Sequence, residues 1–106
     1  MDWPVTYRRK IRYSDTDAQG IVFNGNYAIY IDDTLTDYLD AVGLPSEVFL
    51  RSGHDMVLAR SEIDFRSAAR LGETLVTGAH VTRVGKSSVT FALQSWEEGS
   101  GRVVID

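Results

Sequence analysis

One segment of this 106-residue chain has helical periodicity, and the segments around it do not. From residue 26 to residue 42, apolar side chains recur every three or four positions, which predicts a helix about 25 Å long. Asn24 or Asn26 is expected to cap its start, and Gly43 followed by Pro45 is expected to end it. The expected buried face consists of Tyr27, Tyr30, Ile31, Thr34, Leu35, Tyr38, Ala41 and Val42.

The segments before and after this helix indicate strands. Residues 5–13 alternate, with Val5, Tyr7, Arg9, Ile11 and Tyr13 on one face. After the helix, strand patterns cover residues 56–65, 73–84, 86–96 and 102–105, with a tight hairpin turn at residues 83–86. Because one helix cannot cover both faces of a sheet, we predict an α+β fold, an antiparallel sheet around one central helix.

The predicted sheet leaves edges and one face without a covering element. Exposed edges of this kind favour pairing with a second copy of the chain. We therefore expect self-association to a homodimer or a larger homo-oligomer, and a monomer with charged edges remains the alternative. A chain of this length and composition, 43% apolar and 25% charged, predicts a single domain spanning residues 1–106.

Composition excludes several functional classes. With no cysteine, the chain has no disulfide, thiolate metal site or cysteine nucleophile. Eleven basic against fifteen acidic residues give a net charge of -4, which argues against nucleic-acid binding. No apolar run has the length of a membrane span or a signal peptide, so a cytoplasmic protein without a membrane partner is expected. His54 and His80 have no carboxylate at a ligand-like spacing, so no metal site is expected.

Two carboxylates, Asp15 and Asp17, lie between the first strand and the helix. The unpaired N–H groups and the dipole at a helix N-terminus favour developing negative charge. A carboxylate beside such a site suits the hydrolysis of an activated ester. The alternative is a structural turn in which one or both aspartates bind backbone N–H groups. The spacing alone leaves both interpretations open.

Two sets of basic residues are weaker candidates for binding phosphate. Arg83 and Lys86 flank the predicted hairpin turn, and either one has the charge to meet phosphates. Arg60, Arg66 and Arg70 form a second, scattered set. For both sets the alternative is an ordinary solvated surface.

Residues 14–45 carry a longer pattern: Asp-x-Asp-x-x-Gly-Ile-Val, then Asn-Tyr at the helix start and Gly-Leu-Pro after its end. This pattern resembles the signature of the 4-hydroxybenzoyl-CoA thioesterase-like branch of the hot-dog fold. The rest of the chain agrees less sharply, at residues 57–65, 71–73 and 85–89. The matched positions are Asp15, Asp17, Gly20, Ile21, Val22, Asn26, Tyr27, Gly43, Leu44 and Pro45.

The resemblance implies a hot-dog sheet wrapped around the helix, in dimers that often form tetramers. It also implies hydrolysis of an acyl-CoA thioester, with Asp17 as nucleophile or as general base. The backbone N–H near Asn24 would polarise the carbonyl, so the oxyanion and substrate-positioning residues are Asn24, Gly25, Asn26 and Tyr27. The residues expected to contact CoA phosphates are Arg83, Lys86 and Ser87. Coenzyme A enters as part of the substrate, and no other cofactor is expected.

The chain departs from many relatives of that branch at three places. The segment Phe23-Asn24-Gly25 contains no histidine, Leu35 stands where an arginine is expected, and the last strand is short or truncated at Asp106. The absent histidine argues against a hydratase or dehydratase. A non-catalytic protein that binds acyl-CoA or another ligand remains the alternative to a thioesterase. The residues expected to line the acyl pocket are Phe23, Tyr27, Tyr30 and Met56.

Overall fold

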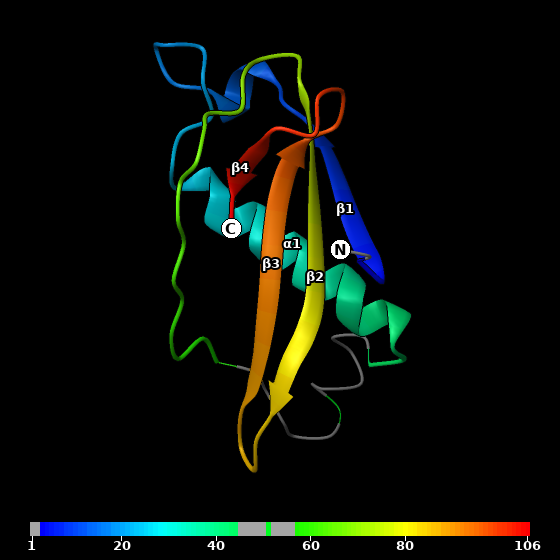
Figure 1. Cartoon of the computed structure of the whole chain (residues 1–106). Coiled ribbons are helices and arrows are strands. Elements are labelled where there is room, and N and C mark those ends of the chain that lie inside the picture. Colours follow the sequence, from blue (N-terminus) through cyan, green and yellow to red (C-terminus); the bar gives the residue numbers. More distant parts are fainter. Residues whose placement is uncertain (1–2, 45–50, 52–56) are drawn as a thin grey trace.

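The computed structural model describes residues 3–44, 51 and 57–106, which form one helix packed on one antiparallel sheet (Figure 1). The strands are β1 (Val5–Lys10), β2 (Thr74–Val84), β3 (Val89–Glu97) and β4 (Val103–Ile105), in the spatial order β1-β2-β3-β4. A short 3-10 turn, η1 (Tyr13–Asp15), precedes the helix α1 (Asn26–Ala41). The predicted α+β architecture is confirmed.

The sheet is antiparallel throughout, and its centre is the long β2–β3 hairpin. Val84 pairs with Val89, so the connecting loop consists of residues 85–88. Gly85 N–H donates to Ser88 O at 2.7 Å and closes that loop. The hairpin prediction is confirmed, but its turn lies two residues further along than expected because Arg83 and Val84 still pair with β3.

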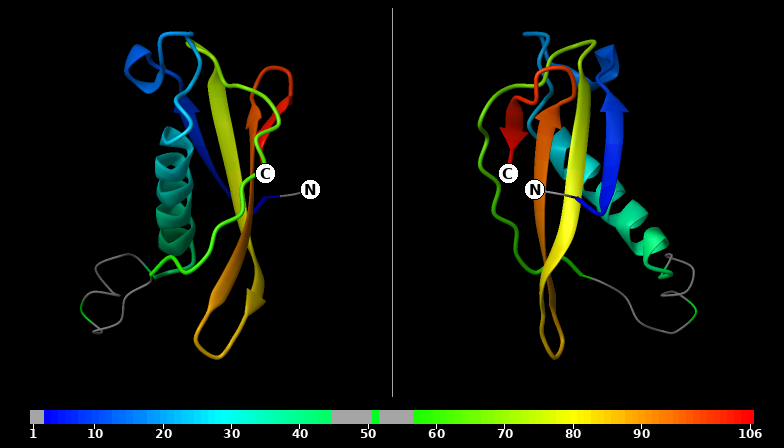
Figure 2. Two further views of the ribbon diagram at one scale, coloured as in Figure 1. Left: turned by 90° about the vertical axis from the view of Figure 1, so that its left-hand side faces the viewer. Right: turned by 45° about the vertical axis from the view of Figure 1, so that its right-hand side comes forward.

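The helix α1 lies along one face of the sheet (Figure 2) and buries an aromatic stripe against it. Tyr27, Tyr30 and Thr34 are buried, and they face a core formed with Ile11, Val22, Ala69, Leu75, Val104 and Ile105. At the other end Ala41 and Val42 are exposed, because the last turn of the helix extends past the sheet (Figure 2). The prediction for these two residues is wrong.

The cap prediction is also wrong. Gly25 is the N-cap residue, and no side chain makes a capping hydrogen bond to the helix. Asn26 instead uses its side-chain amide to bind the carbonyl oxygen of Asp15. At the other end the helix stops before Gly43, as predicted, where a positive φ of 83° favours glycine. Pro45 lies outside the described residues.

Two predicted strands are shorter than expected. β1 ends at Lys10, and Tyr13, 83% exposed, begins the η1 turn instead of continuing the strand. Residues 57–63 are extended but belong to no strand of the described chain, and Met56 lies outside it. Pairing with the last segment begins only at Asp64, whose N–H donates to Asp106 O at 2.9 Å. Arg66 N–H then donates to Val104 O at 2.8 Å, which fixes the following loop next to the helix start.

No helix in the described part of the chain is both long enough and apolar enough to cross a bilayer.

Candidate functional site

The segment that leads into α1 doubles back on itself and meets a loop from much later in the chain. Asp17 N–H donates to Ile21 O at 2.9 Å, and Thr16 bridges to Val22. Val22 N–H then donates to Ala69 O at 2.9 Å. Gly20 has a φ of 75°, which allows the chain to reverse without strain from a side chain. The carboxylate segment, the helix start and residues 65–70 are thereby brought together.

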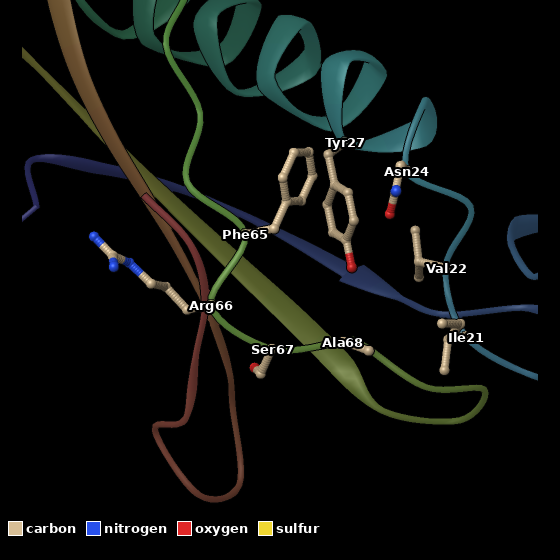
Figure 3. A pocket seen from close by; sticks show the side chains of 8 residues that line it. All are labelled: Ile21, Val22, Asn24, Tyr27, Phe65, Arg66, Ser67 and Ala68. Carbon is tan, nitrogen blue, oxygen red and sulfur yellow. The ribbon is translucent and has the colours of Figure 1, made fainter.

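A cavity of about 220 Å³ opens where these segments meet (Figure 3). Tyr27 and Phe65 form part of its wall with their rings edge to face at 5.8 Å. Arg66 points away from the other lining side chains (Figure 3) and pairs with Asp106, Nε to Oδ1, at 3.1 Å. The lining residues are Ile21, Val22, Asn24, Tyr27, Phe65, Arg66, Ser67 and Ala68.

Tyr27 gives this largely apolar cavity a neutral hydroxyl. Its oxygen accepts a hydrogen bond from Ala69 N–H at 3.3 Å, and burial raises the pKa of Tyr27 above its ordinary value. The hydroxyl therefore stays protonated at neutral pH. Tyr27, one of the predicted site residues, lines the cavity.

Two backbone N–H groups at the start of α1 have no hydrogen-bond partner among the described residues. Asn26 N–H and Tyr27 N–H are engaged, donating to Phe23 O at 2.9 Å and to Asn24 O at 3.3 Å. Within the described residues, the N–H groups of Asn24 and Gly25 have no hydrogen-bond acceptor. Since Asn24 borders the cavity, these donors and the positive end of the helix dipole lie beside it.

The structure gives the two aspartates different environments. Asp15 is 5% exposed, its Oδ1 is 2.7 Å from Arg9 Nη2, and its Oδ2 accepts the N–H of Arg12 at 2.9 Å. Burial alone would raise the pKa of Asp15, but hydrogen bonds from Arg9 and the Arg12 N–H hold that pKa below its ordinary value. Asp15 is therefore a structural carboxylate, as the turn interpretation predicts for it.

Asp17, by contrast, is exposed to solvent. Its Oδ1 accepts the N–H of Gln19 at 2.8 Å, which is an Asx turn and fixes the orientation of the carboxylate. In the described chain its Oδ2 has no hydrogen-bond partner. Asp17 does not line the cavity itself, but it pairs through its backbone with Ile21, which does.

The other described residues predicted for the oxyanion site or the acyl pocket do not line the cavity. The Phe23 ring lies close to Gly25. A side chain at position 25 would collide with that ring, since its Cβ would lie 2.9 Å from Phe23 Cε1. Phe23 is 59% exposed and does not line the cavity. Tyr30 does not line it either: its ring lies under the Arg9 guanidinium, with 5.1 Å from the ring centroid to Arg9 Cζ. Met56 lies outside the described residues.

The predicted phosphate contacts are far from the cavity within one chain. Arg83, Lys86 and Ser87 are exposed at the tip of the β2–β3 hairpin, and the helix start lies at the opposite end of the sheet (Figure 1). Phe65, Ser67 and Ala68 were not expected in the site. Their pairing with β4 and the hydrogen bond from Val22 N–H to Ala69 O bring them there, and no local pattern in the sequence predicts either contact.

Among residues 3–44, 51 and 57–106, no histidine lines the cavity. No three His, Asp or Glu side chains there come together in a way that would hold a metal ion. His80 is on β2, against the Trp3 ring at 5.1 Å between centroids, and His54 lies outside the described residues.

Comparison with known proteins shows the family of the chain. Residues 19–104 match the family model described as the thioesterase superfamily, a match that begins two residues after Asp17. Over 83 residues the chain is 26% identical to the acyl-CoA thioesterase YbgC of Haemophilus influenzae, which covers 77% of this chain and 61% of that protein.

Solved structures have the same fold. The crystal structure of hypothetical protein TT1821 from Thermus thermophilus is 26% identical with a TM-score of 0.87, covering 94% of this chain and 75% of that one. A thioesterase from Thermus thermophilus, solved with coenzyme A and Zn, is 26% identical with a TM-score of 0.82, covering 98% and 78%. The fold is therefore that of the hot-dog thioesterases, and the chain belongs to the thioesterase superfamily.

Proposed function

We propose that this chain hydrolyses the thioester of an acyl-CoA to the free acid and CoA. The observation that carries the proposal is the helix start. Asn24 lines the cavity there, and the N–H groups of Asn24 and Gly25 have no acceptor among the described residues. The exposed carboxylate of Asp17 belongs to the same loop, seven residues before Asn24. The similarity to an acyl-CoA thioesterase and to a thioesterase solved with coenzyme A supports the same substrate class.

In this proposal the acyl group enters the cavity and the thioester carbonyl oxygen accepts hydrogen bonds from Asn24 and Gly25 N–H. These donors stabilise the negative charge that develops on that oxygen when the carbonyl carbon becomes tetrahedral. As general base, Asp17 takes a proton from a water whose oxygen attacks the carbon. As nucleophile, Asp17 attacks the carbon itself, and water then cleaves the mixed anhydride. In both cases the C–S bond breaks and CoA leaves as the thiolate, which is then protonated.

The residues predicted to contact the CoA phosphates lie at the tip of the β2–β3 hairpin, at the end of the sheet opposite the helix start (Figure 1). We keep Arg83, Lys86 and Ser87 as proposed phosphate contacts. Because they lie at the far end of the sheet, they would act from a second copy whose hairpin tip approaches the first copy's cavity (Figure 1). The homodimer or homotetramer and the cytoplasmic location likewise stay predictions.

A non-catalytic acyl-CoA-binding protein is the second candidate, and the position of Asp17 outside the cavity lining favours it. The experiment combines calorimetric binding with detection of free thiol, using purified protein and a panel of aromatic and aliphatic acyl-CoAs. Hydrolysis predicts thiol release above the buffer rate for at least one ester. Binding without any release would establish the second candidate, and a folded protein showing neither would contradict both.

A further inference from the structure

The carbonyl oxygen of Asp15 accepts two hydrogen bonds from the segment at the start of α1. Phe23 N–H donates to it at 3.1 Å, and the side-chain Nδ2 of Asn26 donates to it at 2.9 Å. These two donors stand immediately before and after residues 24 and 25. One oxygen therefore fixes both ends of the peptide segment that presents the free N–H groups.

The other polar atoms of Asp15 are also hydrogen-bonded, which holds the residue in place. Asp15 N–H donates to Arg12 O at 2.9 Å, and both carboxylate oxygens are bound, by Arg9 and by the Arg12 N–H. With only 5% of its surface exposed, Asp15 has no freedom to follow the helix start if that start moves. It is an anchor, and Asp17 follows it by two residues.

We infer that the contact between Asn26 Nδ2 and Asp15 O sets the position of the Asn24–Gly25 donors relative to the Asp17 carboxylate. This inference rests on the proposed hydrolysis and deepens it. Asn26 acts here as a positioning residue, because its side chain binds backbone and does not line the cavity. Loss of alignment by about 1 Å between a substrate and a catalytic group lowers rates by about 100-fold.

Asn26→Asp separates positioning from helix stability. Aspartate has the shape of asparagine but no donor, so it repels the Asp15 carbonyl instead of binding it. At the N-terminus of a helix a carboxylate is favourable, so a role in helix stability alone predicts an unchanged or more stable protein. Asn26→Ala removes the donor without adding charge. The matched control is Thr36→Ala, an exposed helix side chain that also donates to a backbone carbonyl, Asp32 O at 3.0 Å.

The kinetic arm measures thiol release from the best acyl-CoA ester together with the melting temperature. We expect both Asn26 variants to lose tenfold or more in kcat, with little change in KM or melting temperature, while Thr36→Ala keeps the wild-type kcat. Wild-type kcat in both Asn26 variants would overturn the inference and leave the hydrolysis intact. An inactive wild-type protein would instead overturn the proposed function.

The second arm does not depend on activity and uses amide resonances from NMR. Positioning predicts that Asn26→Asp shifts the resonances of Asn24 and Gly25 relative to wild type, together with those of residues 15–17, whereas Thr36→Ala leaves them in place. If the resonances on both sides of the contact keep their wild-type positions in Asn26→Asp, the contact does not position the donors and the inference is wrong.

Discussion

Arg9 Nη2 lies 2.7 Å from Asp15 Oδ1, so an ion pair between β1 and the following turn anchors the segment that precedes the helix. The carboxylate is buried, and the Arg9 side chain remains 32% exposed. This pair gives the two aspartates different environments: Asp15 is neutralised by an arginine, and Asp17 faces solvent.

The ion pair predicts a pH-dependent contribution to stability. Asp15→Asn removes the charge that faces Arg9, so the free energy of unfolding at pH 7 should fall by about 1.5–3 kcal/mol, the usual range for a hydrogen bond to a charged group. Because the pKa of Asp15 is lower in the folded state, the unfolded chain binds more protons near the ordinary aspartate pKa. The stabilisation is complete above about pH 4 and is lost as pH falls through the folded pKa.

Urea unfolding of wild type and Asp15→Asn from pH 7 to pH 2 measures this. The difference between the two proteins should be constant down to about pH 4 and then shrink. Asp40→Asn, on the exposed side of α1, is the control and should track wild type throughout. A difference that stays constant to pH 2 would show that the charge of Asp15 contributes nothing.

On the sheet face opposite the helix, Gly78 is in close contact with Trp3. A Cβ at Gly78 would lie 2.8 Å from Trp3 Cβ and closer still to two atoms of the indole ring. Gly78→Ala should therefore displace Trp3 and cost about 1–3 kcal/mol of stability, as overpacking usually does. Intrinsic tryptophan fluorescence should change, because Trp3 also stacks on Trp96 at 6.3 Å between ring centroids.

A double-mutant cycle tests the cause of that loss. With Trp3→Ala in place, Gly78→Ala should cost little further stability, since the ring it collides with is gone. If the stability losses of the two single variants add up in the double variant, Gly78→Ala destabilises β2 itself and not through contact with Trp3.

The cavity predicts how the chain selects acyl groups. Ala68 lines it, so Ala68→Leu fills part of the volume and should lower kcat/KM for the bulkiest accepted acyl group by about 10- to 200-fold, the range for small changes in an apolar pocket. Small acyl groups should be affected less. Ala28→Leu, exposed on α1, is the control, and equal losses for every acyl length would place the acyl group elsewhere.

The proposed contact between Lys86, in the β2–β3 hairpin, and the CoA phosphates is tested with a substrate that lacks the nucleotide. Lys86→Ala should raise KM for an acyl-CoA several-fold, because an exposed charge contact is worth about 1 kcal/mol or less. It should leave KM for the matching acyl-pantetheine, which has no phosphates, unchanged. Lys10→Ala on β1 is the control. An equal effect on both substrates, or none on either, would remove Lys86 from the site.

The architecture was largely predictable from the sequence because its signals are local. Periodicity predicted the helix to within one residue at its end, and alternation predicted the hairpin. Where a strand ends was less predictable: the alternation of β1 continues to Tyr13, but Tyr13 begins the η1 turn. The last backbone contact of this segment with the start of β2 is made by Ile11, whose N–H donates to Glu73 O at 2.8 Å.

The site was predictable only in part. The residues around Asn24 and Asp17 are close in sequence, so the pattern that predicts the helix start also places them. Phe65 and Ser67 come to the cavity through pairing with β4, about forty residues away, and no local pattern carries that information. The different roles of Asp15 and Asp17 also depend on a tertiary contact, the side chain of Arg9.

The rate of thiol release by Asp17→Asn relative to wild type tests the central claim most directly. Asparagine can still accept the N–H of Gln19 through its side-chain oxygen, so the turn and the fold should persist. With Asp40→Asn at the wild-type rate, we expect Asp17→Asn to lose about 100-fold or more in kcat, as the removal of a catalytic base does. Equal rates in Asp17→Asn and wild type on every acyl-CoA would contradict the assignment of Asp17.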